Sequence, residues 1–270
     1  MTENTQSPNT ADNRPLALVT GASSGIGLEI AKQFARHGYD LVMTAEDAEL
    51  TSAAHEVPPV GAEVYTVRVD LRSREGVEQL WTAVTGLRRP VAAAALNAGI
   101  GVGGPFAETD LDDELSLIDL NVTSTVHLAK LLVRQMVARD EGKLLFTSSI
   151  ASTMPGGNQA VYNASKSFVQ SFAQALQAEL VDARIQVTTL MPGPVDTEFF
   201  DRAGMTDTPM GKGPKDSPEA VAEQGVRALL AGEDKVLAAS LVVKAQGMAN
   251  RLLPDRLKAA ANREGAAHKS

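Results

Sequence analysis

Short apolar runs alternate with amphipathic stretches along most of this chain. The first apolar run, residues 16–19, is typical of a fully buried strand. After it, Ile26, Ile30 and Phe34 recur at the spacing of one helical face. Because the alternation continues to about residue 240, it predicts an α/β fold. We expect one doubly wound Rossmann-type domain, with a parallel sheet of about seven strands and helices on both faces.

The other elements follow from the same pattern. Strands are predicted at 40–45, 63–69, 91–96, 143–147, 185–190 and 236–239. A long helix is expected from residue 111 to about 138, and another opens at Ser217-Pro218. We expect a flexible tail at 1–14, a single domain over 15–261 and a loose tail at 262–270. The amphipathic stretch 241–261 could pack on the domain, form a subunit contact or cover the substrate site, and the sequence does not distinguish these three roles.

A glycine-rich turn joins the first strand to the first helix, with the sequence TGASSGIG at residues 20–27. Gly21 permits an unusual backbone angle, Gly25 lets phosphates approach the main chain, and Gly27 allows close helix–strand packing. The free N–H groups and the positive end of the helix dipole would face an anion. The turn predicts a dinucleotide site, although similar turns also occur where nothing binds.

Acidic residues follow the second and third predicted strands. Glu46 can accept hydrogen bonds from the adenosine ribose and would repel a 2′-phosphate. Alternatively, Glu46 and Asp47 only begin the next helix, where acids suit the dipole. Asp70 either faces the cofactor or caps the helix that follows Ser73.

Polar residues at helical positions suggest chemistry in the second half of the chain. Tyr162 and Lys166 stand four positions apart and share one helix face. Asn121 lies in the middle of a predicted helix, where asparagine is unfavourable. It either faces solvent or has a specific hydrogen-bonding task.

Charge and composition narrow the function classes. The 25 Lys and Arg against 33 Asp and Glu leave a formal net charge of −8, which argues against nucleic acid or an anionic membrane surface as the main partner. The absence of cysteine excludes disulfides and thiolate metal sites. The four histidines are scattered without ligand spacing, so we expect no metal. Without a signal-like or membrane-spanning run, we expect a cytoplasmic protein.

Taken together, these residues resemble the single-domain short-chain dehydrogenase/reductase family over roughly residues 15–240. The resemblance rests on Thr20-Gly21, Gly25-Ile26-Gly27, Asp70-Leu71, Asn97-Ala98-Gly99, Asn121, Ser149, Tyr162, Lys166 and Pro192-Gly193.

The resemblance implies an NAD(P)-dependent oxidoreductase that transfers hydride between a nicotinamide and a secondary alcohol, ketone or aldehyde. Tyr162 would exchange the proton, with its pKa lowered by Lys166 and by the oxidised nicotinamide. Ser149 would hydrogen-bond the substrate oxygen, Lys166 would also hold the nicotinamide ribose, and Asn121 would anchor a water on a proton path. Besides Tyr162 and Lys166, the predicted cofactor contacts are Gly21, Ser23, Ser24, Gly25, Ile26, Gly27, Glu46, Asp70, Leu71, Asn97, Ala98, Gly99, Pro192, Gly193, Val195 and Thr197.

Cofactor choice is open between NAD and NADP. Ser24 and Glu46 stand where NADP-preferring relatives often carry Arg or Lys, which favours NAD. Ala45, however, stands where strict NAD relatives usually carry Asp. The family also implies a homodimer or homotetramer. A dinucleotide-binding sensor or scaffold without turnover is the alternative, although such a protein has no need of Ser149, Tyr162 and Lys166 together.

The substrate is not specified by these motifs. Residues 150–159, the loop 195–216 and the C-terminal segment would form its site, and a connection as long as 195–216 is typical of a functional lid. Phe199, Phe200 and Met205 are either an apolar pocket lid or packing residues.

Overall fold

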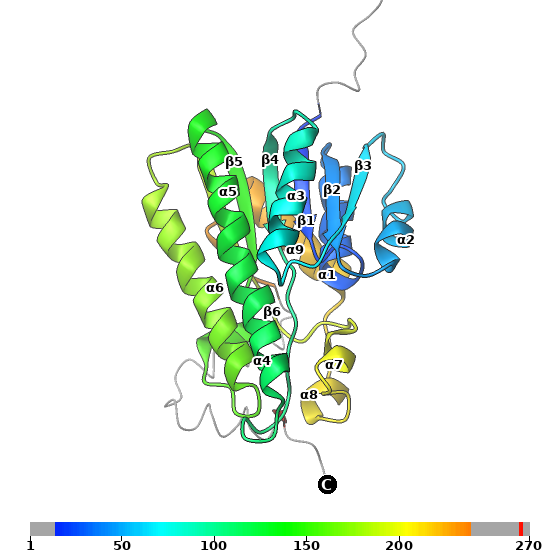
Figure 1. Cartoon of the computed structure of the whole chain (residues 1–270), viewed down its shortest axis with the longest axis vertical. Helices are drawn as coiled ribbons and strands as arrows, with labels where there is room; N and C mark the ends of the chain where they lie inside the picture. Colours follow the sequence, from blue (N-terminus) through cyan, green and yellow to red (C-terminus); the bar gives the residue numbers. More distant parts are fainter. Residues whose placement is uncertain (1–13, 239–264, 267–270) are drawn as a thin grey trace, which may run out of the picture.

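Seven parallel strands form one sheet at the centre of the molecule (Figure 1). The computed structural model describes residues 14–238 and 265–266. The strand order is β3-β2-β1-β4-β5-β6-β7, so the predicted doubly wound fold is confirmed. The strands are β1 (Leu16–Thr20), β2 (Asp40–Ala45), β3 (Val64–Arg68), β4 (Val91–Leu96), β5 (Gly142–Thr147), β6 (Ile185–Pro192) and β7 (Lys235–Ala238). Each lies within two residues of its predicted bounds.

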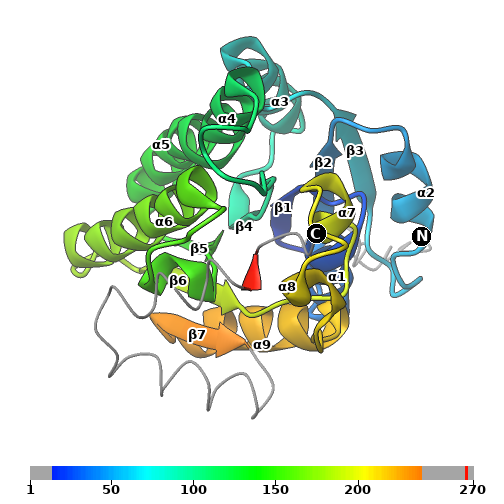
Figure 2. The ribbon, with the colours of Figure 1, turned by 90° about the horizontal axis from the view of Figure 1, so that it is seen from below.

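Helices cover both faces of the sheet (Figure 2). On one face pack α1 (Gly25–Arg36), α2 (Glu49–His55) and α9 (Pro218–Ala231). On the other lie α3 (Arg74–Gly86), α4 (Leu111–Ile118), α5 (Ser124–Arg139) and α6 (Ala160–Glu179). The first helix stops where the sequence predicts, because Gly38 takes a φ of +86° just beyond it.

One apolar core lies on each side of the sheet, because successive residues of a strand face opposite sides. Leu18 belongs to the core beneath α3, α5 and α6, whereas its neighbours Ala17 and Val19 belong to the core beneath α1 and α9. Every residue of β1 and β2 is buried. This explains why the central strands are continuous apolar runs, as expected for a parallel sheet covered on both faces.

The strand order reverses between β1 and β4, which pair side by side in parallel. In open α/β sheets, ligands bind beyond the carboxyl ends of the strands at such a reversal. The turn after β1 and the loop after β4 meet there, because an added Cβ at Gly21 would lie 2.9 Å from the Ala98 Cα. The topology therefore places the glycine turn and the Asn97–Gly99 loop on one ligand crevice.

The helix predicted over 111–138 is interrupted. Residues Asp119–Thr123 form a π-helical segment between α4 and α5, and Asn121 lies inside it. Such π segments occur frequently at functional sites. The predicted helical stretch is therefore confirmed, and it changes to π geometry at the residue that carries the unusual polar side chain.

The long connection 195–216, which we call the lid after its predicted role, is structured. It contains two short helices, α7 (Phe199–Arg202) and α8 (Pro209–Lys212), which lie beyond the strand ends in Figure 1. A parallel bridge between Val195 and Asp216 closes its base. Ala266, near the C-terminus, is buried against Phe200 and Met205 of this lid.

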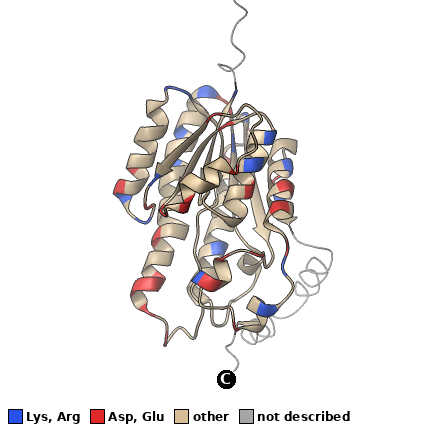
Figure 3. Ribbon diagram, turned by 90° about the vertical axis from the view of Figure 1, so that its right-hand side faces the viewer, with Lys and Arg blue, Asp and Glu red and all other residues tan. Residues whose placement is uncertain are grey.

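Acidic and basic residues are interspersed on the side of the molecule shown in Figure 3. None of the helices in the described part of the chain is both long and apolar enough to cross a bilayer. The whole amphipathic stretch 241–261 and most residues of the predicted tails, 1–14 and 262–270, lie outside the described residues, as does Ala239 of the predicted last strand.

Candidate active site

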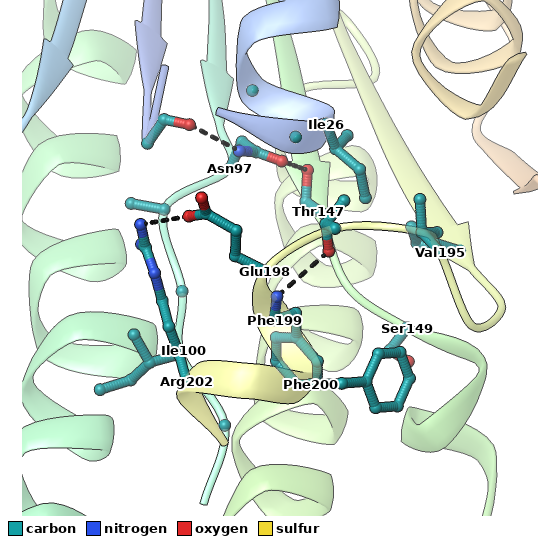
Figure 4. Close-up of a pocket in the computed structure, with 18 of the residues that line it drawn as sticks. Ile26, Asn97, Ile100, Thr147, Ser149, Val195, Glu198, Phe199, Phe200 and Arg202 are labelled. Carbon is teal, nitrogen blue, oxygen red and sulfur yellow. Dashed lines mark hydrogen bonds and ion pairs between the residues drawn. The ribbon is translucent and has the colours of Figure 1, made fainter. Parts of the chain in front are cut away.

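A cavity of about 660 Å³ opens at the carboxyl ends of the strands (Figure 4). It collects residues from the turn after β1, the ends of β2 to β6, the start of α6 and the lid. All the predicted cofactor contacts line it, and so do Ser149, Tyr162 and Lys166. Asn121 alone among the predicted site residues is not part of the wall.

The glycine turn is shaped for close approach. Gly25 has a φ of +54°, and a Cβ there would lie 2.9 Å from the Thr197 Cγ2. A Cβ on Gly27 would lie only 1.9 Å from the Gly21 carbonyl oxygen. The Ser24 side chain makes no capping hydrogen bond, and the first turn of α1 has no acidic residue. The helix N-terminus thus presents its dipole and N–H groups to the cavity, as an anion requires.

Asn97 ties the strand ends together beneath the cavity. Its Nδ2 donates to the Thr20 carbonyl oxygen at 3.2 Å, and its Oδ1 accepts from the Thr147 hydroxyl at 3.0 Å (Figure 4). The Thr20 hydroxyl in turn accepts from the backbone N–H groups of Asn97 and Ala98. These bonds connect β1, β4 and β5, so the cavity floor is a fixed surface.

Tyr162 and Ser149 both line the cavity and are joined by a hydrogen bond. Burial raises the pKa of Tyr162 to about 12, although a hydrogen bond with Ser149 acts to lower it. The expectation that Lys166 and an oxidised nicotinamide lower this pKa concerns the cofactor-bound protein and stays a prediction. The Lys166 Nζ lies 6.0 Å from the Tyr162 ring centroid.

Lys166 is buried and aimed at the strand ends. Its Nζ donates to the Thr147 carbonyl oxygen at 3.0 Å. Burial lowers the pKa of Lys166 to about 8. A Cβ on Gly99 would lie 3.1 Å from the Lys166 Nζ and 3.0 Å from the Asn121 Oδ1. Gly99 therefore leaves room for both polar groups beside the cavity.

Asn121 has the specific hydrogen-bonding task, because its side chain is buried rather than solvent-facing. Its Oδ1 accepts from the Ile100 N–H and its Nδ2 donates to the Ile100 carbonyl oxygen, both at 2.9 Å. A further bond reaches the Ser165 hydroxyl at 3.0 Å. Asn121 thus holds the loop after β4 against α6. Its predicted role in anchoring a water stays a prediction.

The acidic residues at the ends of β2 and β3 meet an arginine. Arg72 forms an ion pair with Glu46, and its Nε donates to Asp70 at 2.9 Å. Burial alone would raise the pKa of Asp70, but the hydrogen bonds from Arg72 outweigh it and hold that pKa below its usual value. Asp47 accepts from the Ser23 hydroxyl at 2.8 Å.

None of these acids is the N-cap of a helix. Helix α2 begins at Glu49 after Ala48, so Glu46 and Asp47 precede it without capping it. The cap of α3 is Ser73, whose hydroxyl accepts from the Gly76 N–H at 3.0 Å. Asp70 is left for the cavity wall.

The lid brings an aromatic residue onto the predicted proton donor. The Phe199 ring centroid lies 5.2 Å from that of Tyr162. Gly101 makes room for this ring, because a Cβ there would lie 2.5 Å from the Phe199 Cζ. Both alternatives for the apolar residues of the lid, lining the pocket and packing, therefore occur. Phe199 lines the pocket, and Met205 packs within the lid.

Several contacts were missed by sequence reasoning. Arg72 has no motif of its own, and only the pairing of β2 with β3 could indicate that it reaches Glu46. Asn163 also holds the loop that begins at Ser149, because its Nδ2 donates to the carbonyl oxygens of Ala151 and Met154, both at 3.1 Å. Within residues 14–238 and 265–266, no group of three or more possible metal ligands is found.

Comparison with known proteins agrees with this geometry. The family model for short chain dehydrogenases matches residues 15–208. An NADP-dependent 3-hydroxy acid dehydrogenase of Salmonella typhi is 29% identical over 217 residues, covering 76% of this chain and 87% of that protein. A sulfoacetaldehyde reductase of Chromohalobacter salexigens is 33% identical over 184 residues, covering 67% and 73%.

A solved structure is similar throughout the fold. The short-chain dehydrogenase of Sphingobium yanoikuyae in complex with NADPH superposes with a TM-score of 0.75 at 26% sequence identity. The match covers 89% of this chain and 96% of that one.

Proposed function

The chain belongs to the short-chain dehydrogenase/reductase family, and on that premise we propose that it reduces a ketone or aldehyde, or oxidises the alcohol, with NAD or NADP. One observation supports the proposal above the others. Ser149, Tyr162 and Lys166 line the same cavity as a glycine turn with an uncapped helix N-terminus. An anion site beside an acid–base group is what a dinucleotide-dependent oxidoreductase needs.

The residues divide the chemistry between them. When bound, a reduced nicotinamide supplies the hydride that adds to the carbonyl carbon. Tyr162 donates its hydroxyl proton to the carbonyl oxygen, and the Ser149 hydroxyl hydrogen-bonds the same oxygen as negative charge develops there. Because burial raises the pKa of Tyr162 to about 12, the phenol stays protonated near neutral pH.

Cofactor binding is divided between two ends of the cavity. The turn at Gly21–Gly27 would hold the diphosphate, and Asp70 with Leu71 would meet the adenine. Thr197 would meet the nicotinamide carboxamide, and Lys166 its ribose. The empty backbone space at Gly25 and the uncapped start of α1 support this assignment.

Acidic charge at the adenosine end supports NAD over NADP. Glu46, Asp47 and Asp70 line that end of the cavity, whereas Arg72 is already bonded to two of these carboxylates. A 2′-phosphate placed there would meet like charge. The proposal therefore differs from the Salmonella relative, which is named as NADP-dependent.

Replacing Glu46 by arginine is expected to shift cofactor preference toward NADPH by about tenfold to a hundredfold, the effect of a charged hydrogen bond gained in place of a repulsion. The measurement is fluorescence titration with NADH and NADPH, compared with the unmodified protein. Glu49→Arg is the matched control, because it makes the same change in charge on a residue outside the cavity wall. Tighter binding of NADPH than NADH by the unmodified protein would contradict the assignment.

The substrate is a carbonyl compound whose substituents meet an apolar wall. Phe199, Ile150 and Met154 line this side of the cavity. The two relatives described above are named for a 3-hydroxy acid and for sulfoacetaldehyde, both of which carry an acidic group. A carbonyl compound with such a group is therefore the first class to screen, with consumption of the reduced cofactor as the readout.

An apolar patch on α4 and α6 supports a homo-oligomer. Leu111, Leu115 and Ile118 follow one face of α4 and are exposed by 66%, 48% and 37%. Phe168 of the neighbouring helix α6 is exposed by 40%. We propose that a second copy of the chain covers this patch through a two-fold contact.

Replacing Leu115 by glutamate is expected to convert the assembly to monomers, because each two-fold contact would then bury two unpaired carboxylates. Light scattering after size exclusion measures the mass directly. Val60→Glu is the control, since Val60 is similarly exposed, at 45%, but lies in the loop before β3. A monomeric unmodified protein would contradict the proposed assembly.

A further inference from the structure

Lys215 is a cation of the cavity that the proposed mechanism does not use. It lies at the end of the lid and lines the cavity. Its side chain is only 20% exposed. Taking an ammonium group out of water costs free energy unless hydrogen bonds or opposite charges replace the lost water.

Among the described residues, Lys215 has only weak contacts to replace the water that its ammonium group loses on burial. Its Nζ lies 3.9 Å from the Asp196 Oδ1, beyond hydrogen-bond distance, and that carboxylate is 78% exposed. Its other recorded contact is the Phe200 ring, whose centroid is 4.8 Å away. The Nζ donates no hydrogen bond to any described residue. Within the described part of the chain, the three N–H donors of the ammonium therefore have no acceptor.

The other two cations of the cavity wall are already bonded. Lys166 donates to the Thr147 carbonyl oxygen at 3.0 Å. Arg202 donates to Glu198 at 2.7 Å, as Figure 4 shows. Lys215 is thus the lining cation in the described part of the chain that has no hydrogen bond.

The position of Lys215 connects it with the glycine turn. The backbone of the next residue, Asp216, bonds to Pro194 and Asp196 across the base of the lid, at 2.8 Å and 2.9 Å. Thr197, one residue further along that opposite segment, lies against Gly25. The ammonium and the uncapped start of α1 therefore belong to neighbouring parts of one wall.

We propose that Lys215 binds an anionic group in the cavity through phosphate or carboxylate oxygens. Two sources of this chemistry fit the proposed function, on which the inference rests: the diphosphate of the dinucleotide and an acidic group on the carbonyl substrate. The lid then contributes a charged contact to the ligand as well as an apolar wall. Because Phe200 contacts both Lys215 and Phe199, anion binding and the placement of Phe199 on Tyr162 involve the same short helix.

The test compares Lys215→Gln with Lys212→Gln. Lys212 is the matched control, since it is 65% exposed, pairs with Asp207 at 3.1 Å and does not line the cavity. If the diphosphate is the ligand, Lys215→Gln weakens binding of both NADH and ADP-ribose about tenfold or more, as expected for a lost charged hydrogen bond. Binding of adenosine, which has no phosphate, stays unchanged. Lys212→Gln leaves all three affinities unchanged.

A second set of measurements tests whether Lys215 binds the acidic group of the substrate instead. In that case NADH and ADP-ribose affinities are unchanged in Lys215→Gln, and KM rises for a 3-oxo acid but not for its methyl ester. Lys215→Arg retains the charge and restores most of the lost affinity in either case. Equal losses in the glutamine and arginine variants would mean that shape rather than charge matters, and would overturn the proposal.

The remaining outcomes are also decisive. Unchanged NADH, ADP-ribose and 3-oxo acid values in Lys215→Gln would show that the ammonium binds no anion, and would leave the proposed oxidoreductase function standing. Failure of the unmodified protein to bind NADH or NADPH would instead overturn the proposed function, and this inference with it.

Discussion

Replacing Tyr162 by phenylalanine is expected to lower kcat for carbonyl reduction by about 10²- to 10⁴-fold, the usual contribution of a positioned acid or base. The substitution removes one hydroxyl and keeps the ring that contacts Phe199. NADH affinity is expected to stay nearly unchanged, because the glycine turn and the acidic end of the cavity are untouched. Stopped-flow measurement of cofactor oxidation, together with fluorescence titration, separates the two effects.

Tyr65→Phe is the matched control for this substitution. Its hydroxyl donates to Glu63 at 2.7 Å on the exposed edge strand β3, away from the cavity wall. The control is expected to retain full activity. Full turnover in Tyr162→Phe would remove the phenol from the mechanism and would overturn its assignment as the proton donor.

Replacing Gly27 by alanine is expected to have the largest effect on stability. A Cβ at this position would lie 1.9 Å from the Gly21 carbonyl oxygen and 2.7 Å from the Asn97 Nδ2. The first neighbour is backbone, so the turn itself must move. Overpacking of this kind costs about 1–3 kcal/mol, which lowers Tm by about 2–12 °C in a chain of this size. The displaced turn is also expected to weaken NADH binding.

Gly86→Ala is the control, because Gly86 ends α3 and a Cβ there meets nothing within 4 Å. Alanine in a helix restricts the unfolded chain, so Tm should stay the same or rise slightly. Thermal unfolding followed by circular dichroism measures both variants. A Gly27→Ala variant with unchanged Tm and unchanged NADH affinity would show that the turn is not as tightly packed as its geometry indicates.

The glycine turn illustrates how far sequence reasoning extends. Its role was predictable because the constraint is local: a short turn between strand and helix needs positive φ at Gly25 and no side chain at Gly27. The parallel sheet was predictable for a similar reason, since covered strands must be continuously apolar. The order of Ser149, Tyr162 and Lys166 was recognisable from a resemblance, and the structure brings all three to one cavity.

Other features depend on which elements become neighbours. Arg72 reaches Glu46 because β3 pairs with β2, and Phe199 reaches Tyr162 because the lid folds back over α6. The π segment at Asn121 is likewise set by partners on another loop and helix. Local propensity does not encode contacts between distant elements. Hydrophobic periodicity therefore predicted a regular helix around Asn121.

The sequence by itself determined the fold class, the ligand-binding turn and the residues suited to acid–base chemistry, because backbone sterics and hydrophobic periodicity act over a few residues. Tertiary structure alone decided how those residues are charged and what surrounds them. The pKa of Tyr162 is the clearest case. The resemblance implies a decrease caused by Lys166 and a bound nicotinamide, whereas burial in the folded cavity acts in the opposite direction, since desolvation depends on every element that closes around the phenol.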